Sequence, residues 1–160
     1  MTRTILALAA LAALFCISAG TKDADKKADK EKLQGTWKFV SVQVQGREEP
    51  MPDGIRVVIT SDTLTMVYPK DGDNKEEKKG WKYTIDPSKD PKEMDWFVEE
   101  TPGQSIHQPA IYVLEGATLK ICSTAQGKPR PTKFESKRGD FGGLWVLKRV
   151  APPATQQAAK

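Results

Sequence analysis

The chain has 160 residues, of which 38% are hydrophobic and 29% are charged, and its formal net charge is +4. This balance is typical of one globular domain, and it excludes a wholly disordered chain and a membrane-spanning one. Residues 33–150 hold 18 basic and 17 acidic groups. Because this part of the chain is nearly neutral, we expect no nucleic acid among its partners.

The N-terminus has the three-part layout of a secretory signal. A basic start at Met1–Arg3 precedes an apolar run of 13 residues, Ile5–Ile17, and small residues follow up to Gly20. The run is too short for a transmembrane helix, so residues 1–20 are predicted to be a cleaved signal peptide of an exported protein, periplasmic or secreted, with no stable membrane insertion. Acylation at Cys16 is the alternative, but Phe15 stands where lipoprotein processing needs a small residue.

Two polar segments flank the part of the chain with core-forming periodicity. Residues 21–32 (TKDADKKADKEK) contain no large apolar side chain, which indicates a charged linker, a solvated spacer or a frayed helical turn. Residues 151–160 (APPATQQAAK) are predicted to be a disordered tail. The folded domain is therefore expected over residues 33–150.

Alternating apolar residues in short runs predict antiparallel strands throughout this domain. In residues 36–45, Trp37 and Phe39 share one parity while Val40 and Val42 share the other, and this switch indicates a β-bulge. Further strands are expected over residues 55–59, 63–66, 81–86, 94–98, 111–114, 118–122 and 144–149, with a short one at Phe134. About eight or nine strands and no long helical period predict an all-β barrel or sandwich.

No motif in the sequence demands a particular chemistry. Phosphate loops, dinucleotide fingerprints and paired-cysteine metal sites are missing, so no metal, cofactor or catalytic residue is predicted. Removal of Cys16 with the signal leaves Cys122 without a disulfide partner, and the one histidine, His107, is expected in a proline-rich loop. Asp71, Asp73 and Asn74 are expected to form a turn, because Lys75 interrupts any calcium-loop pattern.

Clustered carboxylates offer one enzymatic alternative. Glu93, Asp95, Glu99 and Glu100 form the densest acidic group, and a pair of facing carboxylates could serve a periplasmic hydrolase or isomerase. Alternation places Asp95 and Glu99 opposite the apolar Met94, Trp96 and Val98. A solvated strand face is the simpler interpretation of that pattern.

Aromatic residues recur on neighbouring predicted strands. Trp81, Tyr83, Trp96 and Tyr112 are the candidate ligand-binding residues for a small apolar molecule in a barrel interior. The same side chains could instead fill a solid core, which would leave a module that binds or inhibits a protein partner. An open apolar cavity would favour the first alternative and a packed barrel the second.

Five segments spread over the domain carry a resemblance to a known family. They are LQGTWKFVSVQV at 33–44, YTIDPSKDPKEMD at 83–95, IYVLEGATLKIC at 111–122, GKPRPTKFES at 127–136 and LWVLKR at 144–149. In order and spacing, they resemble an uncharacterised lipocalin-like domain family that is abundant in planctomycete bacteria and often exported.

The resemblance implies a small, up-and-down antiparallel barrel of about eight strands, with no established activity. Gly35 and Trp37 look like the GxW signature of lipocalins, whose Trp closes one barrel end beneath a basic residue from the far end of the chain. Arg149 is the candidate for that residue. Together these features predict an exported, non-enzymatic binding module.

Overall fold

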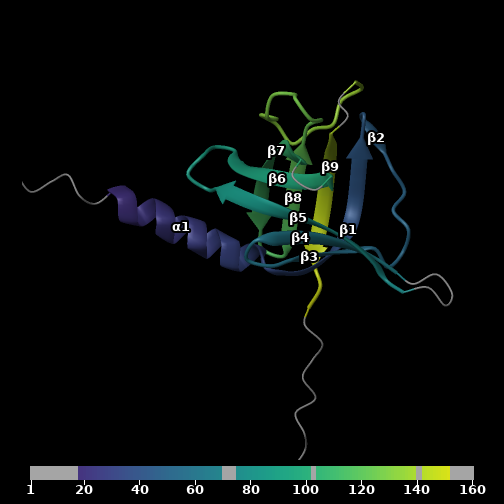
Figure 1. Ribbon diagram of the computed structural model, residues 1–160, viewed down its shortest axis with the longest axis horizontal. Coiled ribbons are helices and arrows are strands. Elements are labelled where there is room, and N and C mark those ends of the chain that lie inside the picture. The colour runs from purple at the N-terminus through teal and green to yellow at the C-terminus, as the bar shows by residue number, and fades with distance from the viewer. Residues whose placement is uncertain (1–17, 70–74, 102–103, 140–141, 152–160) are drawn as a thin grey trace, which may run out of the picture.

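In the computed structural model, which describes residues 18–69, 75–101, 104–139 and 142–151, antiparallel strands close into a barrel with one helix at its end (Figure 1). The elements are α1 (Ser18–Leu33), β1 (Gly35–Val44), β2 (Arg47–Glu48), β3 (Arg56–Ile59), β4 (Thr63–Tyr68), β5 (Glu77–Asp86), β6 (Lys92–Thr101), β7 (Gln104–Glu115), β8 (Thr118–Ser123) and β9 (Gly143–Arg149). The described part excludes residues 1–17, 70–74 and 152–160. These segments contain most of the predicted signal, the turn expected at Asp71, Asp73 and Asn74, and nearly all of the predicted tail.

The strands follow one another around the barrel in chain order. From β3 to β9 each strand pairs antiparallel with the next, and β1 pairs with both β3 and β9, which closes an eight-stranded ring. The two-residue β2 folds back on the end of β1 as a short extra strand. The predicted all-β, lipocalin-like, up-and-down barrel is confirmed.

The predicted bulge in the first strand is present. The register of β1 against β9 shifts between Phe39 and Ser41, so that Val40 is 60% exposed. Trp37 and Val42 are both buried although they have opposite parity. The extra residue lets one strand keep its apolar side chains inside the barrel on both sides of a bend.

Residues 21–32 differ from the predicted linker, because they belong to α1. The last turns of this helix pack on one end of the barrel, where Leu33 is fully buried and Asp29 is 8% exposed. The Asp29 carboxylate accepts hydrogen bonds from Lys92 Nζ at 2.6 Å and from the Tyr112 hydroxyl at 2.8 Å. The contact of the helix rests on one large apolar side chain, Leu33, and on a partly buried ion pair, neither of which produces a helical hydrophobic period.

The closed end of the barrel is built around Trp37. This fully buried indole donates from Nε1 to the Leu33 carbonyl at 2.9 Å, and the Arg149 guanidinium carbon lies 4.1 Å from its ring centroid. The arginine also donates to the carbonyls of Gln34 and Lys32. The stacking expected from the sequence is therefore present, and it ties the C-terminal strand to the end of α1.

Gly35 makes that stacking sterically possible. Its φ is +131°, and a Cβ at this position would lie 2.6 Å from Arg149 Nη1. Both the backbone conformation and the passage of the arginine over the indole favour glycine here. The predicted closure residues Gly35, Trp37 and Arg149 thus lie together.

The loop between β8 and β9 covers the outer face of the barrel rather than adding a strand. Phe134, expected in a short strand, packs instead on the small outer cluster of Ile111, Cys122 and Leu144. The Cys122 thiol lies 3.4 Å from the Glu135 carbonyl oxygen. The apolar side chain of Phe134 anchors this loop to the barrel. Alternation alone cannot distinguish such a loop anchor from a residue of a short strand.

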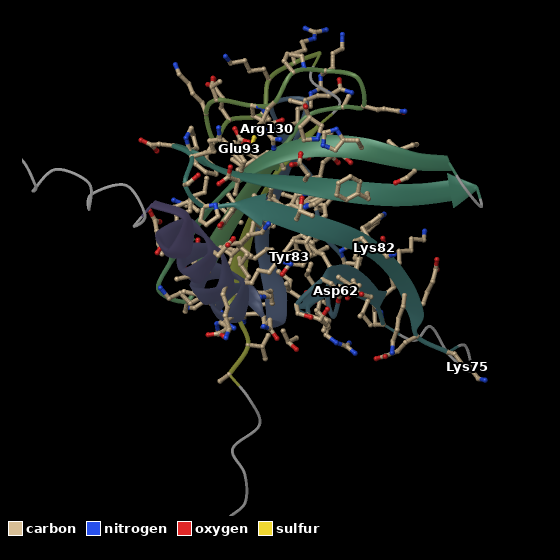
Figure 2. All side chains as sticks on the ribbon, turned by 60° about the vertical axis from the view of Figure 1, so that its left-hand side comes forward. Asp62, Lys75, Lys82, Tyr83, Glu93 and Arg130 are labelled. Atoms are coloured by element: carbon tan, nitrogen blue, oxygen red, sulfur yellow. The ribbon has the colours of Figure 1, made fainter. Side chains whose placement is uncertain are left out.

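From the buried hydroxyl group of Tyr83 we predict a loss of folding stability at high pH. It donates to the Thr60 carbonyl at 2.8 Å, and burial, assisted by the negative charge of nearby Asp62, raises its pKa from 10.0 to about 12 (Figure 2). Folding therefore holds the phenolic proton more tightly, and stability present below pH 10 falls as the pH rises towards 12, by about 2 kcal/mol from this group. Denaturant titrations across pH 9–12 should show a shallower decline in Tyr83→Phe than in the parent.

The matched control for this prediction is Tyr68→Phe, which removes the hydroxyl of a partly exposed tyrosine. Its decline over the same pH range should parallel that of the parent. Equal slopes in the parent and in Tyr83→Phe would show that the Tyr83 proton is not linked to folding.

Candidate functional site

The end of the barrel away from α1 contains an apolar cleft of about 470 Å³. On β9 the chain runs from the cleft at Trp145 to the closed end at Arg149, and on β1 it runs from Trp37 at the closed end to Val44 in the cleft. We call this site the tryptophan cleft. Its lining residues are Val44, Trp81, Trp96, Ile106, Gln108, Ser123, Ala125, Gln126, Gly142, Gly143 and Trp145.

Three of the chain's four tryptophans line the cleft. The Trp96 and Trp145 rings are tilted by 39° with centroids 5.0 Å apart, and Phe39 meets Trp145 edge-on at 5.5 Å. Trp81 is partly buried and packs against the same core. The indoles give the cleft wide, rigid apolar walls, which are suited to a flat or compact apolar molecule.

A short polar strip borders the indoles. The side-chain amide of Gln108 donates to the Thr124 carbonyl at 2.9 Å and to Ser123 Oγ at 3.3 Å. Ser123 Oγ also accepts from the Gly143 backbone at 3.5 Å. None of the described residues that line the cleft carries a charge, so this part of its wall presents apolar surface and neutral polar groups.

One buried polar atom of the cleft residues lacks a partner. Trp96 is 5% exposed, and its Nε1–H has no hydrogen-bond acceptor within the described part of the chain. A buried donor without a partner costs about 1–3 kcal/mol. Within the described part of the chain, this cost falls at the wall of the apolar cleft.

The structure brings together two of the four aromatic residues that the sequence suggested for ligand binding. Trp81 and Trp96 line the cleft. Tyr83 and Tyr112 lie deeper in the packed core, where their hydroxyls bind Thr60 and Asp29. Burial and the hydrogen bond to Asp29 both raise the pKa of Tyr112, and this tyrosine belongs to the α1 contact rather than to the cleft.

Sequence reasoning did not include Trp145 and Gln108 in the site. Trp145 belongs to the site because β9 pairs with both β1 and β8 and so closes the barrel. This closure brings the Trp145 ring next to that of Trp96. Gln108 was expected in a loop with His107, but β7 begins at Gln104 and pairs Gln108 with Trp96. The polar Gln108 stands on the same inner face as Ile106, Ala110 and Tyr112, and it interrupts the apolar alternation of this strand.

Glu93 and Asp95 of the acidic cluster lie on the outside of the barrel, where Figure 2 shows Glu93 beside Arg130. Arg130, from the loop after β8, contacts Glu93 at 3.5 Å and Asp95 at 2.7 Å, and it donates to the carbonyls of Met94 and Ala110. Asp95 also lies 2.6 Å from His107 Nε2. These two carboxylates hold the loop against β6 and β7, whereas the side chains of Glu99 and Glu100 lie outside the described ones.

Comparisons with known proteins give this chain no relative. No family model matches it, and neither does any curated protein or solved structure. In the described part of the chain, no helix is long and apolar enough to cross a membrane.

Proposed function

We propose that this protein is an exported, non-enzymatic binding module that takes a small apolar or amphipathic molecule in the tryptophan cleft. The observation that carries the proposal is a 470 Å³ cleft walled by Trp81, Trp96 and Trp145 at the open end of an otherwise packed barrel. Small-molecule sites are commonly concave, mostly apolar and provided with a few placed polar groups. The cleft has each of these properties.

The packed half of the interior limits where a ligand can bind. Buried side chains fill the barrel between the cleft and α1, among them Tyr83, Met94, Tyr112 and Leu119. An eight-stranded barrel is only wide enough for side chains or one small ligand. The ligand is therefore expected at the mouth of the barrel, against the indoles, and not beside the two tyrosines.

Titration with the neutral dye N-phenyl-1-naphthylamine tests this proposal. The dye should bind saturably, with its emission enhanced and tryptophan emission changed, because the indoles form the walls of the site. Trp81→Ala should weaken binding about tenfold, since it removes an aromatic wall worth roughly 1–2 kcal/mol. The readout is the dissociation constant from dye fluorescence.

Tyr83→Phe is the control, because it changes an aromatic residue of the packed core outside the cleft. It should bind the dye like the parent. Absence of saturable binding by the parent would favour a protein-interaction module with a filled barrel, and equal binding by Trp81→Ala would place the dye elsewhere.

Export is the second part of the proposal. Cleavage after Gly20 leaves Asp29 and Leu33, the buried residues among those of α1 whose burial is described, on the mature chain, so processing is compatible with the closed barrel end. N-terminal sequencing of protein recovered from the periplasm or medium should give Thr21 as the first residue. A lipid-modified Cys16 at the N-terminus would contradict it.

A further inference from the structure

We infer that the ligand of the tryptophan cleft carries a neutral acceptor oxygen, such as a ketone, ester or amide carbonyl, which accepts a hydrogen bond from Trp96 Nε1. This inference rests on the proposed function and adds the chemical class of the ligand. Three observations support it: an unpartnered donor, the absence of charge in the lining, and a second tryptophan whose donor is satisfied.

The unpartnered donor is the indole nitrogen of Trp96. Its ring lines the cleft, and its Nε1–H has no acceptor in the described part of the chain. An indole nitrogen can only donate, so only an acceptor atom can satisfy it. The side-chain NH₂ of the nearby Gln108 is itself a donor, so it cannot accept this hydrogen bond. It already donates to Ser123 Oγ and to the Thr124 carbonyl.

Trp37, at the opposite end of the barrel, is a tryptophan with a structural role, and its indole donor has an acceptor. Trp37 is fully buried and Trp96 is 5% exposed, and the Trp37 Nε1–H donates to the Leu33 carbonyl at 2.9 Å. The protein thus supplies a main-chain acceptor to the closing tryptophan. The described part of the chain supplies none to Trp96 of the cleft, and a buried donor left open in this way needs an explanation other than core packing.

The lining argues for a neutral acceptor rather than an anion. No lysine, arginine or histidine is among the described residues that line the cleft. A carboxylate seated against the indoles would lose its hydration without gaining a cationic partner, whereas a carbonyl needs only the single donor. Arg130, a cation of the adjoining loop, is held by Glu93 and Asp95 on the outer face of the barrel.

Ligand entry must also rearrange the rings slightly. The Trp96 ring lines the cleft, but Nε1 itself is covered in this structure. The hydrogen bond can form only when the ligand shifts the contact around Trp96, whose ring centroid lies 5.0 Å from that of Trp145. An acceptor ligand should therefore perturb the Trp96 Nε1–H signal directly.

Three probes with the same ring system test the inference by isothermal titration calorimetry at pH 7. They are naphthalene, 2-acetylnaphthalene and 2-naphthoate, which offer no acceptor, a neutral carbonyl and a carboxylate. The acetyl probe should bind about tenfold more tightly than naphthalene, as expected for one satisfied buried donor. Naphthoate should bind more weakly than the acetyl probe.

Indole N–H signals in a ¹⁵N correlation spectrum give a readout that does not depend on affinity. On addition of 2-acetylnaphthalene, the Trp96 Nε1–H signal should move downfield, while the Trp37 signal stays in place because its acceptor is Leu33. Trp96→Phe should abolish the preference for the acetyl probe, and Trp81→Phe, which alters another wall of the cleft, should retain it.

The outcomes separate this inference from the proposed function. Equal binding of naphthalene and 2-acetylnaphthalene, an unmoved Trp96 signal, or a preference that survives in Trp96→Phe would overturn the acceptor and leave an apolar cleft. Tightest binding of naphthoate would overturn the neutral class. Binding of none of the three probes would overturn the proposed cleft function as well.

Discussion

Trp37→Ala is expected to lower the free energy of unfolding by about 3–5 kcal/mol. The substitution removes a fully buried indole and leaves a cavity at the closed end of the barrel. It also removes the acceptor ring of the Arg149 stacking and the hydrogen bond to Leu33. Urea denaturation followed by far-ultraviolet circular dichroism measures the loss.

Two further variants show which part of the contact matters. Trp37→Phe keeps an aromatic ring beneath Arg149 but removes the donor to Leu33, so it should lose less than the alanine variant. Val40→Ala changes an apolar residue that is 60% exposed at the bulge of the same strand, and it should be nearly neutral. If Trp37→Ala unfolds at the same urea concentration as the parent, the closed end does not depend on this indole.

Gly142→Ala is expected to destabilise the protein by about 3 kcal/mol, at the upper end of the usual range for overpacking. A Cβ at this position would lie 1.9 Å from the Ser123 carbonyl oxygen and 2.5 Å from Thr124 Cα. Both are backbone atoms, so the turn before β9 must move away from the end of β8. Since Gly142 and Ser123 line the cleft, N-phenyl-1-naphthylamine binding should weaken along with stability.

Gly80→Ala is the matched control for the glycine prediction. Its Cβ would meet only the Thr65 side chain on the neighbouring strand, with Oγ1 at 3.2 Å and Cγ2 at 4.0 Å. The change should alter stability by less than about 1 kcal/mol, because alanine also reduces the backbone entropy of the unfolded chain. Wild-type stability and dye binding in Gly142→Ala would show that the turn does not pack as described.

Alternation in the sequence predicted at least part of each of the eight barrel strands and the bulge, because a barrel buries one face of nearly every strand. The parity switch from Phe39 to Val42 is a local signal, and the structure shows the corresponding shift in register. The contact between Trp37 and Arg149 was accessible only through the lipocalin-like pattern, since the two residues are far apart in the chain.

The position of a side chain along the barrel axis could not be predicted from alternation in the same way. Trp81 and Tyr83 share the inner face of β5, and alternation alone cannot tell that one lines the mouth and the other the core. The packing of α1 was likewise hidden, because Asp29 is buried through partners from β6 and β7 rather than through a local apolar pattern. Both features depend on how distant strands meet.

The position of Trp145 shows the same limit within the candidate site. Its aromatic character was evident on the last strand, but its place beside Trp96 follows from the closure of β9 onto β1 and β8. A site assembled from β1 and from β5 to β9 has no sequence motif, because its members are separated by loops of differing length.

A crystal structure of the protein soaked with 2-acetylnaphthalene would test the central claim most directly. The tryptophan cleft predicts density for the ring system between Trp81, Trp96 and Trp145, with the packed core around Tyr83 and Tyr112 unchanged. Density for the probe among the core side chains next to α1, or an unoccupied cleft in crystals whose protein binds the probe in solution, would contradict the account.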